Sequence, residues 1–245
     1  MRDDVSFPAH PVSGSAPKQP GYRSTLDRVE TYFDKTATQT WARLTSDAPV
    51  SKIRQTVREG RDRMRALMLN RLPADMTGQR VLDAGCGAGQ MTIELARRGA
   101  DVLAIDVSPA LVEIAENRLP EALRAQVTFA DGDMLSPAWG RFDHVIAMDS
   151  LIYYTAPDIG RALAELEART QGVIAFTVAP RTPALMAMWY AGKIFPRSDR
   201  SPVMIPHVPA KLTQDARTQG VIGKVQAVER VASGFYISQL MELRT

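Results

Sequence analysis

The distribution of apolar residues divides the chain into three regions. Residues 1–23 contain four prolines with Gly and Ser and few side chains that could pack, which predicts a disordered tail. From residue 24 to 76, apolar side chains recur at helical spacing, which predicts an N-terminal helical lid of two helices, separated by Pro49 and closed by Pro73. From residue 77 to 245, short apolar runs alternate with amphipathic segments, as is typical of an α/β domain.

The third region predicts a mostly parallel, seven-stranded sheet. Helical segments at 90–99, 109–119 and 160–170 lie between apolar runs, and this alternation requires crossover connections with helices on both faces. The last two runs meet at a tight turn around Gly234, so we expect an antiparallel hairpin there. A proline-rich stretch at about 180–210 predicts a cap inserted before the sixth strand. The expected strands are residues 80–85, 101–106, 126–131, 142–149, 172–178, 224–231 and 235–245.

Composition restricts the environment and the partners. The net charge of +3 gives no reason to expect a nucleic-acid partner, although the block from Lys52 to Arg71 is strongly basic. Cys86 is the only cysteine, which excludes a disulfide framework and favours a reducing compartment. No secretory signal and no run of about 20 apolar residues is present. We therefore expect a cytoplasmic protein, and peripheral contact with a membrane is left open.

The turn after the first strand, VLDAGCGAGQ, predicts a loop that binds an adenosine cofactor. Gly85, Gly87 and Gly89 would let the backbone approach a ligand without Cβ clashes. Asp106 ends the second strand, where a carboxylate can accept hydrogen bonds from both ribose hydroxyls. At this point NAD and S-adenosylmethionine (SAM) are both possible cofactors.

Three features favour SAM. Gly89 comes one position too early for a dinucleotide loop. Asp83 would repel a pyrophosphate, but it would attract a sulfonium or an ammonium group. After the third strand, Asp133 is placed to accept from the adenine amine, and Met134 is placed to contact the ring. The residues expected to bind the cofactor are Asp83, Gly85, Cys86, Gly87, Gly89, Asp106, Val107, Asp133, Met134 and Met148.

This set of residues resembles the class I SAM-dependent methyltransferases, which implies their Rossmann-like fold. The stretches AMDSLIYY, FTVAPRTP and GKIFPRSDRSP, with the helical region from Tyr32 onward, are similar to the magnesium protoporphyrin IX O-methyltransferases. The resemblance runs from about Tyr32 to Pro202. It implies methyl transfer from SAM to a propionate of Mg-protoporphyrin IX in bacteriochlorophyll and chlorophyll biosynthesis, with S-adenosylhomocysteine (SAH) as the second product.

The resemblance also implies further partners. Magnesium would arrive inside the porphyrin, so no metal site of the protein is expected. The large porphyrin-binding subunit of magnesium chelatase and the surface of the photosynthetic membrane are the other expected contacts.

A propionate needs no general base, because its pKa of about 4.3 leaves it ionised near neutral pH. Tyr32 and Tyr153 are the candidate catalytic residues, expected to orient a carboxylate or to contact the cofactor. For Tyr32, a purely packing role is equally open. Many relatives of the chlorophyll branch carry His where this chain has Tyr153, so no histidine acid or base is expected there. His144 and His207 are expected to be structural.

The cap supplies the expected porphyrin site. Arg181, Lys193, Arg197 and Arg200 would grip the propionate that does not react. The expected wall for the porphyrin ring is Met186, Met188, Trp189, Tyr190 and Phe195. The alternative is a helix face that packs on the core, with a solvated rim of cations. Two other functions stay open, namely methylation of another carboxylate or phenol, and a SAM-binding protein without catalysis.

Overall fold

The computed structural model describes residues 20–34, 38, 45, 51–183, 185–186, 190, 202 and 204–245. Its strands are β1 (Arg80–Ala84), β2 (Asp101–Asp106), β3 (Val127–Asp131), β4 (His144–Ala147), β5 (Val173–Val178), β6 (Lys224–Ser233) and β7 (Tyr236–Arg244). Its α-helices are α1 (Pro20–Tyr32), α3 (Lys52–Leu69), α4 (Gln90–Arg97), α5 (Pro109–Arg118), α6 (Ala156–Glu167) and α8 (Pro209–Thr218).

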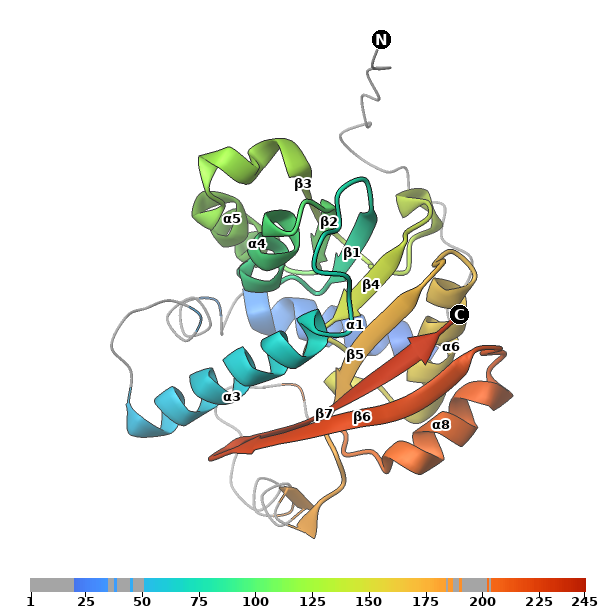
Figure 1. The fold of residues 1–245 in the computed structure, drawn as a ribbon. Coiled ribbons are helices and arrows are strands. Elements are labelled where there is room, and N and C mark those ends of the chain that lie inside the picture. The colour runs from blue at the N-terminus through green and yellow to red at the C-terminus, as the bar shows by residue number, and fades with distance from the viewer. Residues whose placement is uncertain are drawn as a thin grey trace.

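The seven strands form one sheet in the order β3-β2-β1-β4-β5-β7-β6 (Figure 1). The strands β1 to β5 pair in parallel, and β7 lies antiparallel between β5 and β6. This confirms the predicted mostly parallel sheet that ends in a hairpin. The order reverses beside β1, between β2 and β4, and ligands of such sheets bind at the carboxyl ends of the strands at that point.

Alternating side chains of the strands enter two cores on opposite faces. On β1, Val81 packs with α3 and α4, whereas its neighbour Leu82 packs with α6 and α8. Ile146 and Val145 of β4 alternate in the same way. All four side chains are fully buried, so each inner strand is apolar on both faces, as a parallel sheet covered by helices requires.

Helix starts follow the sequence closely. Ser108 caps α5 by accepting from the Leu111 N–H at 3.3 Å, and Pro109 occupies the first turn. Thr155 caps α6, so that helix begins at Ala156, earlier than the predicted residue 160. Helix α8 was not predicted, because its short polar run has only a weak apolar stripe.

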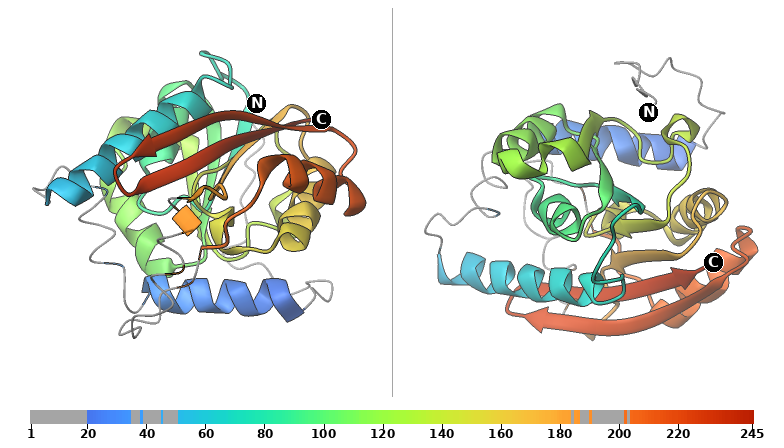
Figure 2. Two further views of the ribbon diagram at one scale, coloured as in Figure 1. Left: turned by 90° about the horizontal axis from the view of Figure 1, so that it is seen from below. Right: turned by 45° about the horizontal axis from the view of Figure 1, so that its top comes forward.

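The boundary of the predicted tail at residue 23 is wrong, because α1 begins at Pro20. Tyr22 holds the first turn in place, since its ring is 4% exposed and stacks on Tyr154 at 4.9 Å. The views of Figure 2 place α1 and the β6–β7 hairpin on opposite sides of the molecule, with α3 beside the hairpin. Residues 1–19 and most of the predicted cap lie outside the described residues.

Candidate active site

The glycine-rich loop after β1 adopts backbone conformations that glycine favours. Gly85, Gly87 and Gly89 have φ angles of 86°, 54° and 82°. A Cβ at Gly85 would also lie 2.4 Å from the Cβ of Ser150, which no side chain could tolerate. The Gly87 N–H donates to Asp106 Oδ2 at 2.9 Å, which fixes the loop to the end of β2.

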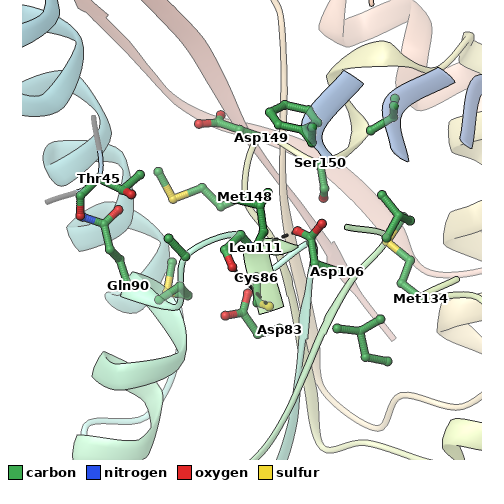
Figure 3. A pocket seen from close by; sticks show the side chains of 18 of the residues that line it. Thr45, Asp83, Cys86, Gln90, Asp106, Leu111, Met134, Met148, Asp149 and Ser150 are labelled. Atoms are coloured by element: carbon green, nitrogen blue, oxygen red, sulfur yellow. Dashed lines mark hydrogen bonds between the residues drawn. The ribbon is translucent and has the colours of Figure 1, made fainter. Parts of the chain in front are cut away.

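A pocket opens where this loop meets the ends of β2 and β4. Helix α1 covers one side through Leu26 and Val29, and helix α3 contributes Arg61 and Arg65. Figure 3 shows Asp149 and Asp83 on opposite sides of the pocket, with Met148 and Asp106 between them. The predicted cofactor residues that line the pocket are Asp83, Gly85, Cys86, Gly87, Asp106, Val107, Met134 and Met148.

Two buried carboxylates give the pocket its electrostatic character. Asp83 is 1% exposed, and burial raises its pKa to about 7, although a hydrogen bond from Thr92 Oγ1 at 2.6 Å opposes the shift. Burial also raises the pKa of Asp106, and the N–H groups of Ser108 and Gly87 oppose it. Such a pair suits a cationic ligand and disfavours a pyrophosphate.

Two predicted cofactor residues lie elsewhere. Gly89 precedes α4, and a Cβ there would lie 3.0 Å from the Cβ of Ala115 on α5, so its close contact is with a helix. Asp133 is not among the pocket-lining residues. Its Oδ1 accepts from the Tyr22 hydroxyl and from the Leu135 N–H, both at 2.9 Å, so this carboxylate already holds α1 in place.

The sequence analysis missed a polar cluster around Asp149. Its carboxylate forms an ion pair with Arg61 and accepts from Thr177 Oγ1 at 3.1 Å and from the Tyr236 hydroxyl at 3.1 Å. From the sequence, Arg61 was interpreted only as part of the basic block from Lys52 to Arg71. Its place four residues before Arg65, on one face of α3, is the signal that could have revealed the pocket-lining pair.

The two candidate catalytic tyrosines occupy different positions. Tyr153 follows β4 and lines the pocket, with its ring edge-on to Phe33 at 6.2 Å. Burial, reinforced by the charge of Asp149, raises the pKa of Tyr153, so its hydroxyl stays protonated. Tyr32 is half-buried at the end of α1, and its ring packs edge-on against Phe33 at 5.2 Å.

The histidines have the expected structural partners. His144 Nδ1 accepts from the Val173 N–H at 3.0 Å, and buried His207 donates from Nε2 to the Tyr154 carbonyl at 3.0 Å. Burial lowers the pKa of both rings. No group of three or more His, Cys, Asp or Glu side chains within the described ranges could hold a metal ion. None of the described helices is long and apolar enough to cross a bilayer.

The predicted porphyrin site is only partly described. Arg181 is exposed and lines a small hollow with His207 and Lys211, and it is not among the residues that line the main pocket. Tyr190 is 56% exposed, and Met186 is half-buried. The other predicted porphyrin contacts lie outside the described residues, namely Met188, Trp189, Lys193, Phe195, Arg197 and Arg200.

Known proteins resemble this chain along nearly its whole length. Residues 81–171 match the family profile described as methyltransferase domain, and residues 147–245 match the profile of the magnesium-protoporphyrin IX methyltransferase C-terminus. The magnesium-protoporphyrin O-methyltransferase of Rhodobacter capsulatus is 61% identical over 91% of this chain and 98% of its own length. The Synechocystis protein of the same name is 28% identical over 87% of this chain and 94% of its own length.

Solved structures share the fold. The magnesium protoporphyrin IX methyltransferase of Synechocystis with bound SAH has a TM-score of 0.74 at 26% identity, and the match covers 88% of this chain and 97% of that one. A geranyl diphosphate C-methyltransferase from Streptomyces coelicolor reaches 0.62 at 13% identity, covering 94% and 98% of the two chains. The same fold therefore accompanies different methyl acceptors, and the acceptor has to be argued from closer relatives.

Proposed function

The chain belongs to the magnesium-protoporphyrin O-methyltransferases, and on this premise we propose how its residues share the work of methyl transfer. The protein transfers a methyl group from SAM to a propionate of Mg-protoporphyrin IX, giving the monomethyl ester in bacteriochlorophyll and chlorophyll biosynthesis. The observation that carries the assignment of the site is the pocket where the glycine-rich loop meets the buried carboxylates of Asp83 and Asp106.

The two buried carboxylates of the pocket suit the positive charges of SAM. In this proposal Asp106 accepts from the ribose hydroxyls, and Asp83 faces the ammonium of the methionine part. Met134 gives apolar contact to the adenine. Arg65 lines the pocket from α3, and 15% of its side chain is exposed. In this proposal its guanidinium pairs with the carboxylate of the methionine part of SAM. Asp133 could accept a hydrogen bond from the adenine amine only in two ways. Its Oδ1 would accept from both Tyr22 and the adenine, or its other oxygen would accept from the adenine.

Bound SAM supplies an electrophilic methyl group. A carboxylate oxygen of the porphyrin forms the new O–CH₃ bond while the S–CH₃ bond breaks, and the bonding electrons stay on sulfur to give SAH. No proton moves, so the protein needs neither an acid nor a base. Its residues hold the carboxylate in line and exclude water, and such positioning is worth about 7–11 kcal/mol. Tyr153, with a hydroxyl that stays protonated, is placed to donate to the carboxylate.

The porphyrin would reach the pocket from the side of α1 and the cap. Tyr32 is the last residue of α1, and Phe33, which directly follows it, lines the pocket; this supports a lid role for the helix. We assign Arg181, Lys193, Arg197 and Arg200 to the propionate that does not react. We also propose two further contacts. The large porphyrin-binding subunit of magnesium chelatase would donate the porphyrin, and the surface of the photosynthetic membrane would be the site of attachment.

The decisive experiment offers the purified protein and SAM a panel of acceptors. Mg-protoporphyrin IX should give the monomethyl ester and one SAH per ester, detected by chromatography and mass. Metal-free protoporphyrin, a simple phenol and a catechol should give far less product. Faster methylation of a phenol would support the first alternative, and SAM binding without turnover of any acceptor would support the second.

A further inference from the structure

We propose that Arg61 holds the reacting carboxylate of the acceptor, and that Asp149 is a positioning residue that balances the charge of this guanidinium. The inference deepens the proposed function, because it assumes that the acceptor carboxylate enters the pocket beside β4. It assigns a task to two residues whose pairing the sequence analysis did not foresee.

Asp149 is fixed in a backbone conformation that few side chains adopt. Its φ angle is 57°, and it is the one non-glycine residue with a positive φ in the part of the chain that the structure describes. It lies two residues beyond the end of β4, at the edge of the sheet where the pocket opens. Residues held in such conformations are concentrated at functional sites. Its N–H donates to Thr177 Oγ1 at 2.8 Å, and this hydroxyl donates back to Asp149 Oδ1 at 3.1 Å.

Three separate elements converge on this carboxylate. Thr177 comes from β5, Tyr236 from β7 and Arg61 from α3. The side chains of Arg61 and Asp149 are 12% and 8% exposed, and both line the pocket. A guanidinium has five N–H donors in a fixed fork, so one such group can pair with a carboxylate of the protein and with a ligand carboxylate together. The network therefore aims a rigid, pre-ordered cation into the site.

The spacing along α3 matches the two carboxylates of the reaction. Arg61 and Arg65 lie one turn apart on the same helix face, and both line the pocket. Arg65 is close enough to Asp83 to lower the pKa of that carboxyl, so it belongs to the cofactor's methionine end. Arg61 is the cation on the Asp149 side, where Ser150 and Tyr153 also line the wall. In this proposal Arg65 binds the carboxylate of the cofactor, and Arg61 binds the carboxylate of the acceptor.

The charge balance explains why such an arginine need not slow the reaction. An uncompensated guanidinium would draw electron density from the carboxylate oxygen, and so make it a poorer nucleophile toward the methyl carbon. Asp149 makes the pair neutral overall, so Arg61 can orient the oxygen by hydrogen bonds while the local potential stays low. The oxygen then attacks, the S–CH₃ electrons pass to sulfur, and no proton is transferred.

The test compares Arg61→Met with Asp149→Asn, because the proposal predicts that only the first variant weakens porphyrin binding. Porphyrin binding is titrated by fluorescence without SAM, SAH binding by calorimetry, and kcat is measured at saturating substrates. Arg61→Met should weaken porphyrin binding about 10-fold or more and leave SAH binding within about twofold. Asp149→Asn should tighten porphyrin binding or leave it unchanged, while kcat falls about 10-fold or more.

Arg63→Met is the matched control, since Arg63 lies on the same helix but is 63% exposed and pairs with Glu229 at 3.0 Å. It should resemble the wild type in all three measurements. If a variant folds poorly, Arg61→Lys and Tyr236→Phe repeat the comparison. The first keeps the charge but removes the planar guanidinium, and the second removes a hydroxyl that donates to Asp149.

Three results would overturn the inference. Weaker SAH binding in Arg61→Met with unchanged porphyrin binding would assign Arg61 to the cofactor. Weaker porphyrin binding in Asp149→Asn would show that the pair acts only as a support. Unchanged behaviour of both variants would remove the pair from the site. The proposed function fails separately, if the wild type binds the porphyrin but forms no ester.

Discussion

At the scale of single residues, the cofactor role proposed for Asp83 predicts that cofactor binding depends on pH. Burial raises the pKa of this carboxyl to about 7, so it holds a proton below that pH when the pocket is empty. A cationic ligand needs the ionised form. We therefore expect SAH affinity, measured by calorimetry, to weaken by up to about tenfold for each pH unit below 7 and to level off above pH 8. The same titration on Asp83→Asn should be flat.

The same residue gives a stability prediction with a definite sign. Because the folded-state pKa lies above the unfolded value, the contribution of Asp83 to stability is complete below about pH 4 and is lost as the pH rises through about 7. SAH relieves this loss, so it should raise the melting temperature more at pH 8 than at pH 6. An equal rise at both pH values, together with pH-independent binding, would contradict the ionisation assigned to Asp83.

A variant of Tyr153 can test whether this residue assists methyl transfer only by orienting the reacting carboxylate. Its hydroxyl stays protonated because burial raises its pKa, so Tyr153→Phe removes a donor and no base. We expect kcat to fall by at most about 10²-fold. We also expect kcat of wild type and variant alike, measured at saturating SAM and porphyrin, to stay flat from about pH 6 to 8.5. A pH inflection near 6.5 that disappears in His144→Ala would instead reveal a histidine base.

At the scale of elements, the periodicity of the chain located the strands of the sheet and most helices, but not the contacts between distant elements. The sequence predicted that the glycine loop and Asp106 lie together, because the loop follows one strand and Asp106 ends the next, and both line one pocket. The link from Arg61 to Asp149 spans 88 positions and depends on how α3 packs against the hairpin, which no local pattern encodes. Tyr22 was likewise assigned to the tail, because its partners Asp133 and Tyr154 lie far along the chain.

Helix α1 offers a prediction at this scale. The Tyr22 hydroxyl donates to Asp133 Oδ1 at 2.9 Å and fastens the start of the helix over the cofactor pocket. Tyr22→Phe keeps the ring that stacks on Tyr154 and removes the hydroxyl, and with it the bond to Asp133, at a cost of about 1 kcal/mol. Amide exchange should accelerate across α1, while exchange in α4 is unchanged. Ser24→Ala is the control, since its hydroxyl bonds only the exposed Gly21 carbonyl. Unchanged exchange in α1 would show that the helix is held by its apolar contacts.

At the scale of the whole molecule, one buried carboxylate joins the helical region to the last strand. Glu242 of β7 is fully buried, and it accepts from Arg71, just beyond α3, and from Arg244, each at 2.5 Å. Gln226 of β6 donates to it as well, at 3.1 Å. Arg61 and Arg65 of α3 line the pocket, so this junction also holds one wall of the pocket in position.

This junction predicts how the molecule responds to acid. Burial alone would raise the pKa of Glu242, but the hydrogen bonds and charges of Arg71 and Arg244 outweigh it and lower the pKa to about 2. The stability that this group adds is therefore present above its unfolded pKa of about 4.5 and is lost as the pH falls through about 2. Glu242→Gln should cost about 3 kcal/mol in urea unfolding at pH 7, and less at pH 3. Glu229→Gln breaks an exposed pair with Arg63 and should cost less than about 1 kcal/mol at either pH. An equal loss in both variants would mean that the buried charge does not hold α3 to the sheet, and the frame of the active site would then rest on apolar packing alone.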